Sequence, residues 1–167
     1  DALTFIMRDE NIRNLIAKGK IKKLVKGCYT AQNENTISVF CFTPAYLGLQ
    51  DALSFHNVWE QETIPIIITS RKVRQGIRSI LGGNILLRRI DKKYFFGFEY
   101  HNQGNDIYLP YSDIEKTLID MVYFKEKIDK EVIKNLIKKI QRKKLNEYLK
   151  RYPIGIKRKV LKILKKS

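Results

Sequence analysis

The sequence has few of the residues that build disulfide frameworks and metal centres. It contains two cysteines and two histidines in 167 residues, and Cys28 and Cys41 lack the spacing of a metal-ligand pair. We therefore expect both cysteines to be reduced, buried and apolar in character. No apolar run reaches the roughly 18 residues of a membrane-spanning helix, and no signal peptide is recognisable, so we expect a cytoplasmic protein with no membrane partner.

The common nucleotide-binding and nucleophile motifs are also missing. Neither GxxxxGK[ST] nor GxGxxG occurs, and Gly82-Gly83 is an isolated pair that favours a turn. No serine or cysteine has a recognisable nucleophile spacing. His56 falls on an apolar helix face, which is more typical of a hydrogen-bonded core residue, and His101 falls in a polar, exposed turn. We predict no catalytic residue, no metal and no cofactor.

Two carboxylates followed by lysine superficially resemble nuclease patterns, so metal-dependent cleavage is a minor alternative. Asp91 falls in an expected hairpin turn. Glu115 falls in an expected first helical turn, where a capping box with Ser112 accounts for an acidic residue without a catalytic role. Asp120, one turn after Lys116, is more typical of an ion-pair partner than of a metal ligand. We expect the protein not to be an enzyme.

Acidic residues become scarce toward the C-terminal end. The chain has a formal charge of +16, and residues 1–124 hold 16 basic and 13 acidic residues, whereas residues 125–167 hold 17 and 4. A charge of this size indicates a polyanionic partner, either nucleic acid or anionic lipid.

The N-terminal pattern predicts one helix followed by a hairpin. Ile12, Leu15 and Ile16 form a helical stripe that begins near Asp9 and ends at Gly19. Residues 21–25 and 28–30 then predict two short strands joined at Gly27, which can adopt positive φ.

The middle of the chain predicts an α+β unit. We expect a core helix over 44–59, with Pro44 in its first turn, a short basic helix over 71–81 and a capped helix over 112–124. The expected strands form a small, mainly antiparallel sheet and cover residues 64–69, 85–90, 94–100 and 107–109.

Beyond residue 125 the pattern predicts only helices, each with one apolar stripe and a lysine-rich remainder, the last two separated at Pro153. The fold class is thus α+β, with three parts. These are a partial winged helix-turn-helix over 1–31, a central mixed α/β domain over 32–125 and basic C-terminal helices over 126–167.

A helix, a glycine and a basic hairpin match the second half of a winged helix, in which the hairpin lies along the phosphates. On this interpretation the hairpin contacts are Lys20, Lys22, Lys23 and Lys26. The same pattern fits a solvated basic face about equally well, so the pattern alone does not decide.

Three segments resemble, in order, the signature blocks of the AbiEi family of antitoxins in type IV toxin–antitoxin systems. They are KGKIKKLVKGCYT at 18–30, YLGLQDALSFHNV at 46–58 and SDIEKTLIDMVYF at 112–124. The resemblance implies a winged-helix, DNA-binding transcriptional regulator that represses its own operon. It also implies a domain that neutralises a nucleotidyltransferase-like toxin, so the implied partners are operator DNA and that toxin.

The resemblance places further DNA contacts on the helix. By position these are Arg8, Asn11, Arg13, Asn14 and Lys18. It also implies that residues 46–58 form the first helix of the second domain. Only eight residues precede Asp9, whereas a winged helix carries two helices before its recognition helix, so we expect a partial module here.

The alternative function is a nucleic-acid-binding module, RNA included, that acts through the C-terminal helices. Further basic residues are candidates for such contacts under either function: Arg71, Arg74, Arg78, Lys138, Lys139, Arg142, Lys143 and Lys144. The oligomeric state is not predicted.

Overall fold

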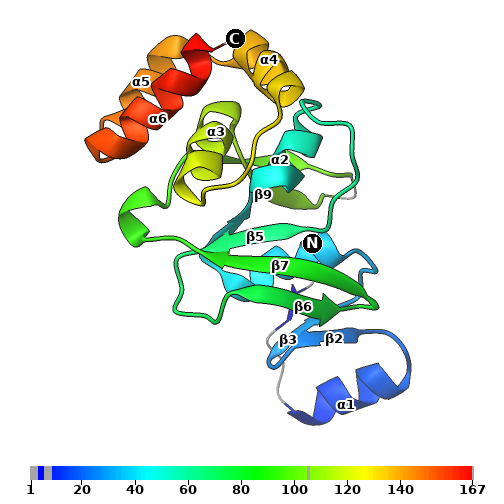
Figure 1. Cartoon of the computed structure of the whole chain (residues 1–167). Helices are drawn as coiled ribbons and strands as arrows, with labels where there is room; N and C mark the ends of the chain where they lie inside the picture. Colours follow the sequence, from blue (N-terminus) through cyan, green and yellow to red (C-terminus); the bar gives the residue numbers. More distant parts are fainter. Residues whose placement is uncertain (1–3, 6–8, 105, 167) are drawn as a thin grey trace.

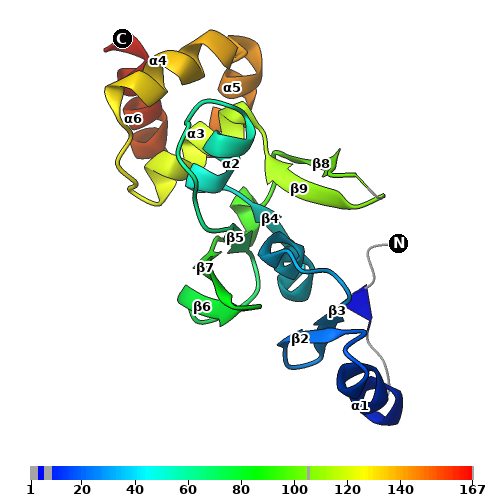
Figure 2. The same ribbon diagram turned by 90° about the vertical axis from the view of Figure 1, so that its right-hand side faces the viewer.

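The computed structural model describes residues 4–5, 9–104 and 106–166, with side chains from residue 11 onward. It is a mixed α/β structure with a six-stranded mixed sheet and a separate three-stranded antiparallel sheet. The small sheet lies at one end of the molecule and the C-terminal helices lie at the other (Figures 1 and 2).

The small sheet has the strand order β1-β3-β2, with helix α1 between its first two strands. The bounds are β1 Thr4–Phe5, α1 Asp9–Ala17, β2 Lys22–Val25 and β3 Cys28–Thr30. The expected N-terminal helix and hairpin are therefore confirmed as secondary structure. Asp9, expected near the helix start, is the first residue of α1, and its side chain lies outside the described ones.

The large sheet has the order β6-β7-β5-β4-β9-β8. Its strands are β4 Ala45–Leu47, β5 Ile66–Thr69, β6 Gly76–Ile80, β7 Gly83–Arg89, β8 Phe98–Asn102 and β9 Tyr108–Ser112. The β5–β7 and β4–β9 pairs are parallel and the other three are antiparallel. The sheet is thus larger and more mixed than the small, mainly antiparallel sheet expected from the sequence.

Alternating side chains of the central strands supply two hydrophobic cores, one on each face of the sheet. On β5, Ile66 and Ile68 join one core and Ile67 joins the other. On β4, Tyr46 points to the first core and Leu47 to the second. This period of two is what an extended strand buried on both faces produces.

Helices cover the first core. They are α2 Leu49–Phe55, α3 Ile114–Tyr123, α4 Lys130–Lys139, α5 Arg142–Leu149 and α6 Ile154–Lys165. The apolar stripes of the last three are buried through Leu136, Leu145, Leu149, Val160 and their neighbours. The prediction of helices beyond residue 125 is confirmed. Within the described residues, no helix has the length and apolar character to cross a membrane.

The second core lies under the 3-10 helix η1, Asn35–Phe42, and the hairpin of the small sheet. Ile37 and Val39 of η1 are almost fully buried, and Leu24 and Cys28 of the hairpin pack in the same cluster. The hairpin is therefore joined to the sheet by apolar contacts as well as by the chain.

The predicted helix over 44–59 is wrong at both ends, because α2 spans only Leu49–Phe55. Residues 45–47 form the central strand β4, and α2 begins only at Leu49. A short apolar run that is buried on all sides has no periodicity that separates a strand from a helix. Gly48, between the two elements, lies close to β5, since a Cβ there would lie 2.5 Å from Ile68 Cδ1.

The predicted basic helix over 71–81 is also wrong. Gly76–Ile80 is strand β6, which pairs with β7 through a two-residue turn at Leu81 and Gly82, both at positive φ. Such a turn favours a tight hairpin. The expected strand over 94–100 begins only at Phe98, because residues 92–94 form the 3-10 helix η2, Lys92–Tyr94.

Helix α3 is present as expected, but its cap differs from the prediction. The N-cap residue is Asp113, whose carboxylate accepts a hydrogen bond from the Lys116 backbone N–H at 2.8 Å. The Ser112 hydroxyl instead contacts the Thr117 hydroxyl at 2.7 Å. Glu115 does not reach back to the cap; its carboxylate accepts from the Gln141 backbone N–H at 2.7 Å and so joins α3 to α5.

Candidate nucleic-acid interface

Helix α1 ends in a left-handed glycine turn that leads directly into the hairpin. Gly19 has φ +67°, its N–H donates to Ile16 O, and the Lys20 N–H donates to Leu15 O, both at 2.9 Å. This pair of bonds satisfies the last carbonyls of the helix and fixes its angle to β2. Gly27, at φ +79°, then turns β2 into β3 as the sequence predicted.

The hairpin carries its lysines outward and its apolar side chains inward. We use the term basic hairpin for residues 20–30. Ile21, Leu24 and Cys28 are buried, whereas Lys20, Lys22, Lys23 and Lys26 are exposed. Within the described part of the chain, none of these lysines forms an ion pair with a carboxylate; the Lys22 ammonium donates to the Asn33 side-chain oxygen. Among the described side chains, no carboxylate neutralises these four charges.

The residues expected on the helix face lie next to this hairpin. In α1, Ile12 is buried against the small sheet, and Asn11, Arg13 and Asn14 are exposed. Lys18 is exposed at the end of the helix. Arg8 lies outside the described residues. Helix α1 lies beside the strands of the basic hairpin at one end of the molecule (Figure 2).

A disulfide holds the basic hairpin to the body, which corrects the expectation of two reduced cysteines. Cys28 of β3 and Cys41 of η1 are bonded, across a sequence separation of 13 residues. No local pattern predicts this pairing, because the two residues meet only when the hairpin folds over η1. The disulfide fixes the hairpin relative to the large sheet.

The three arginines predicted on a basic helix lie instead on and before the edge strand β6. The Arg71 guanidinium donates to Cys41 O at 3.1 Å. The Arg78 guanidinium donates to Arg74 O and Ile77 O. Since β6 is an extended edge strand, these side chains do not form the helical stripe that was expected.

The basic candidates on the C-terminal helices are not equally available. Lys144 forms ion pairs with Asp113 at 3.1 Å and Glu115 at 3.6 Å, so its charge is already balanced. The Lys139 ammonium donates to His56 O. The remaining three, Lys138, Arg142 and Lys143, are exposed, and within the described residues they form no ion pair.

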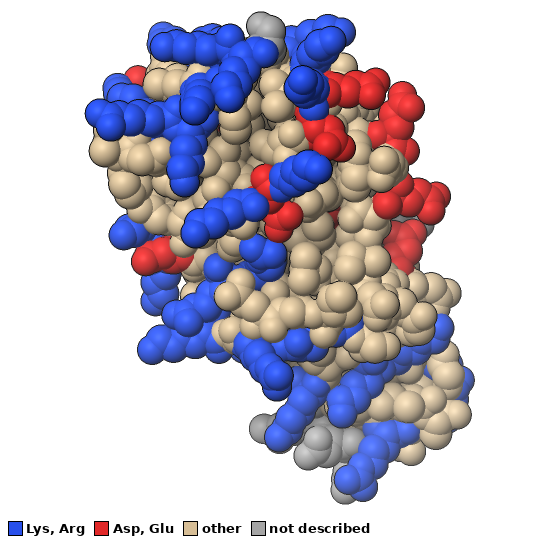
Figure 3. Space-filling view, in the orientation of Figure 1, with Lys and Arg blue, Asp and Glu red and all other residues tan. Residues whose placement is uncertain are grey.

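Basic side chains gather at the two ends of the molecule. Figure 3 shows them over the C-terminal helices and around the basic hairpin, and also down one side of the body between these ends, while most of the acidic side chains lie on the opposite side. The two basic ends are separated by the large sheet (Figure 1).

The histidines and carboxylates considered for catalysis have structural contacts. His56 caps the end of α2, its Nε2 lies 2.7 Å from Ser112 O, and burial lowers its pKa. His101 lies on β8 beside Phe55 and is half-buried, not in an exposed turn as expected. Asp91 caps η2 by accepting from the Lys93 N–H. No three His, Cys, Asp or Glu residues gather to form a metal site in the described ranges.

The comparison with known proteins adds no relative: no protein-family model matches the chain, and a search of curated proteins finds no match.

Proposed function

We propose that this chain is a DNA-binding antitoxin and autoregulatory repressor of the AbiEi type, without catalytic activity of its own. The observation that carries the proposal is the basic hairpin, which projects at one end with unpaired exposed lysines directly after a helix with a polar face. The proposed family rests on the resemblance of the three sequence segments to the AbiEi signature blocks. The proposed partners are operator DNA and a nucleotidyltransferase-like toxin, in the cytoplasm.

The connectivity of the small sheet supports the proposal. In a winged helix, a strand that precedes the recognition helix pairs with the second strand of the wing. Here β1 precedes α1 and pairs antiparallel with β3, and β3 pairs antiparallel with β2. On this proposal α1 acts as the recognition helix and the basic hairpin as the wing, and both contact one DNA duplex.

The alternative of binding through the C-terminal helices rests on their exposed lysines. Because α4, α5 and α6 bury apolar side chains against α3, removal of residues after 125 would expose a core and confuse loss of binding with loss of folding. The two surfaces are better compared by charge removal at each.

We predict that replacing Lys22, Lys23 and Lys26 by alanine flattens the salt dependence of DNA binding. Each lost phosphate contact removes about 0.9 from the slope of log K against log salt, so the slope should change by up to about 2.7. Fluorescence anisotropy with a duplex from the region upstream of the gene, at several salt concentrations, measures this.

The matched control replaces Lys159, Lys162 and Lys165, three exposed lysines of α6. If the control flattens the slope and the hairpin variant does not, the C-terminal helices are the binding surface and the proposed wing is wrong. Co-expression with the product of the neighbouring gene tests the antitoxin part separately; growth arrest that the chain fails to relieve would count against it.

A further inference from the structure

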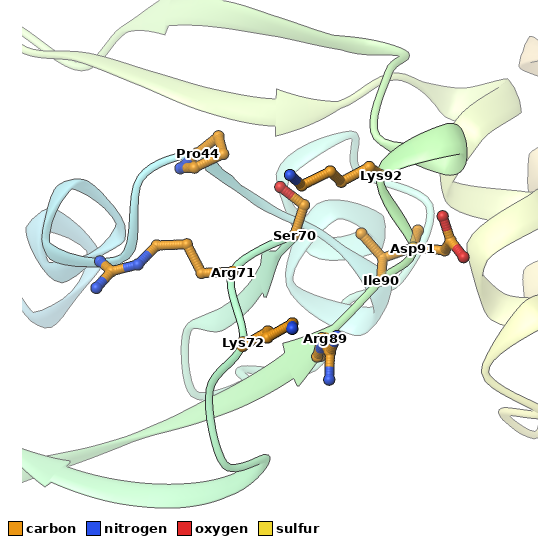
Figure 4. Close-up of a pocket in the computed structure, with 8 residues that line it drawn as sticks. All are labelled: Pro44, Ser70, Arg71, Lys72, Arg89, Ile90, Asp91 and Lys92. Carbon is orange, nitrogen blue, oxygen red and sulfur yellow. The ribbon is translucent and has the colours of Figure 1, made fainter.

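A basic pocket lies at the carboxyl ends of β5 and β7 in the large sheet. Its volume is about 540 Å³, which falls within the roughly 300–1,000 Å³ typical of small-molecule sites. Strands β5 and β7 are parallel neighbours, and both end at this pocket (Figure 4). The carboxyl ends of adjacent parallel strands are a frequent place for ligand sites in α/β proteins.

The residues that follow the two strands give the pocket its charge. Ser70, Arg71 and Lys72 follow β5, Arg89 closes β7, and Lys92 begins η2. Over the described residues, none of the four cationic side chains forms an ion pair with a carboxylate. The lining residues thus carry four positive charges and one negative charge.

The single acidic residue of the pocket does not cancel this charge. The Asp91 carboxylate accepts a hydrogen bond from the Lys93 N–H at 3.1 Å, which engages it in capping η2. In Figure 4 it points away from Ser70 and Lys72, whereas the Lys92 side chain extends toward the Ser70 side of the pocket.

Backbone contacts fix the pocket walls before any ligand binds. The Thr69 hydroxyl donates to Phe42 O and Pro44 O at 2.8 and 2.9 Å, and it accepts from the Arg71 N–H at 3.1 Å. The Ile90 N–H donates to Thr69 O at 2.9 Å, which joins the ends of β5 and β7. A preformed site loses less conformational entropy on binding than a mobile one.

We infer that this pocket binds the phosphate groups of a phosphorylated ligand, such as the phosphate chain of a nucleotide. Arginine presents parallel N–H donors that match phosphate oxygens, and lysine adds point charges around them. One N–H of Arg71 donates to Cys41 O, and in Figure 4 this side chain extends away from Ser70 and Lys72. The proposed phosphate contacts are therefore Lys72, Arg89 and Lys92. The phosphates could belong to a free nucleotide or to a nucleic-acid backbone, since both present the same oxygens.

Titration of the full chain with pyrophosphate and with ATP, at physiological salt in a calorimeter, tests this inference. We expect saturable binding, and at least a tenfold weaker affinity in the Arg89→Ala/Lys92→Ala variant. The control is Lys138→Ala/Arg142→Ala, which removes one lysine and one arginine that are exposed on the C-terminal helices. A thermal melt of each variant confirms that both fold.

The outcomes separate the sources of the phosphate. Loss of pyrophosphate binding with unchanged duplex affinity assigns the pocket to a free phosphorylated ligand, and parallel loss of both assigns it to a nucleic-acid backbone. An equal loss in the control variant, or no saturable binding, would mean that only the general positive field attracts anions, and the inference would be wrong.

Discussion

At the scale of single residues, the interior of the protein holds several charged groups. Lys116 is fully buried and pairs with Asp120, as the spacing of one helical turn predicted. Burial lowers the pKa of Lys116 and raises that of Asp120, while the attraction between the two charges opposes both shifts. The Tyr46 hydroxyl donates to Asp120 at 2.6 Å and the Lys116 ammonium donates to Tyr152 at 3.0 Å. These bonds connect the sheet, α3 and the C-terminal helices.

The buried carboxyl of Asp51 should make the free energy of unfolding depend on pH. Its carboxylate is buried and accepts only the Ile66 N–H among the described groups, at 3.2 Å, and burial raises its pKa from 3.8 to about 7. The pKa of Asp51 is higher in the folded than in the unfolded protein. The contribution of Asp51 to the free energy of unfolding is therefore fully present below about pH 3.8 and is lost as pH rises through about 7. The free energy of unfolding should fall by on the order of 4 kcal/mol over this range.

We expect Asp51→Asn to remove this component of the pH dependence. Urea unfolding at intervals between pH 4 and 8 measures it, with Glu62→Gln as a control at an exposed carboxylate. A variant whose stability still falls between pH 4 and 7 as steeply as the parent protein would show that Asp51 is not the titrating group.

At the scale of elements, glycines mark the places where backbone segments approach closely. Gly97 precedes β8 at φ +76°, and its carbonyl accepts the N–H of Asp113, the cap of α3. A Cβ on Gly97 would lie 2.8 Å from Lys116 Cβ, whereas a Cβ on Gly82, at φ +74°, would meet nothing within 4 Å. The two glycines thus share their backbone conformation and differ in the space around them.

Gly97→Ala should therefore destabilise the protein more than Gly82→Ala. Left-handed backbone costs an alanine about 1–2 kcal/mol at either site, and overpacking against Lys116 adds about 1–3 kcal/mol at Gly97 alone. Free energies of unfolding from urea titration compare the two. Equal losses would show that the contact between Gly97 and Lys116 is not tight.

Helices and turns that have a signal in nearby residues could be predicted from the sequence. Strands whose conformation depends on pairing with distant strands could not. Helix α1, the hairpin turn at Gly27 and the C-terminal helices follow from periodicity and turn residues nearby in sequence. Strands β4 and β6 were predicted as helices, because β4 is apolar throughout and the arginines before and in β6 happen to repeat at a helical interval. Their extended form depends on partners in β5, β7 and β9.

At the scale of the whole molecule, the large sheet with its basic pocket lies between the C-terminal helices and the basic hairpin, and the hairpin is bonded to η1 by the Cys28–Cys41 disulfide. A bridge that closes a loop of about 15 residues stabilises a protein by about 3 kcal/mol. In a reducing cytoplasm such a bond is usually open. The position of the proposed wing would then depend on apolar contacts alone.

Reduction should loosen the basic hairpin without unfolding the large sheet. We expect amide hydrogen exchange in residues 22–30 to accelerate on addition of a phosphine reductant, and exchange in β5 to stay slow. The Cys28→Ala/Cys41→Ala variant should already exchange fast in the hairpin and should not respond to the reductant. Unchanged exchange in the parent protein would show that Leu24 and its neighbours hold the hairpin by themselves.

The sequence by itself determined the excess of positive charge, its concentration in the last quarter, the helix and hairpin at the start, the helices at the end and the Lys116–Asp120 pair. The charge is a sum over the sequence, and each of the other features depends on residues within a few positions of one another. The tertiary structure alone decided the strand order, the disulfide and the basic pocket, in which Arg89 and Lys92 join Arg71 and Lys72. These features require segments distant in sequence to meet, and no local pattern of side chains encodes that meeting.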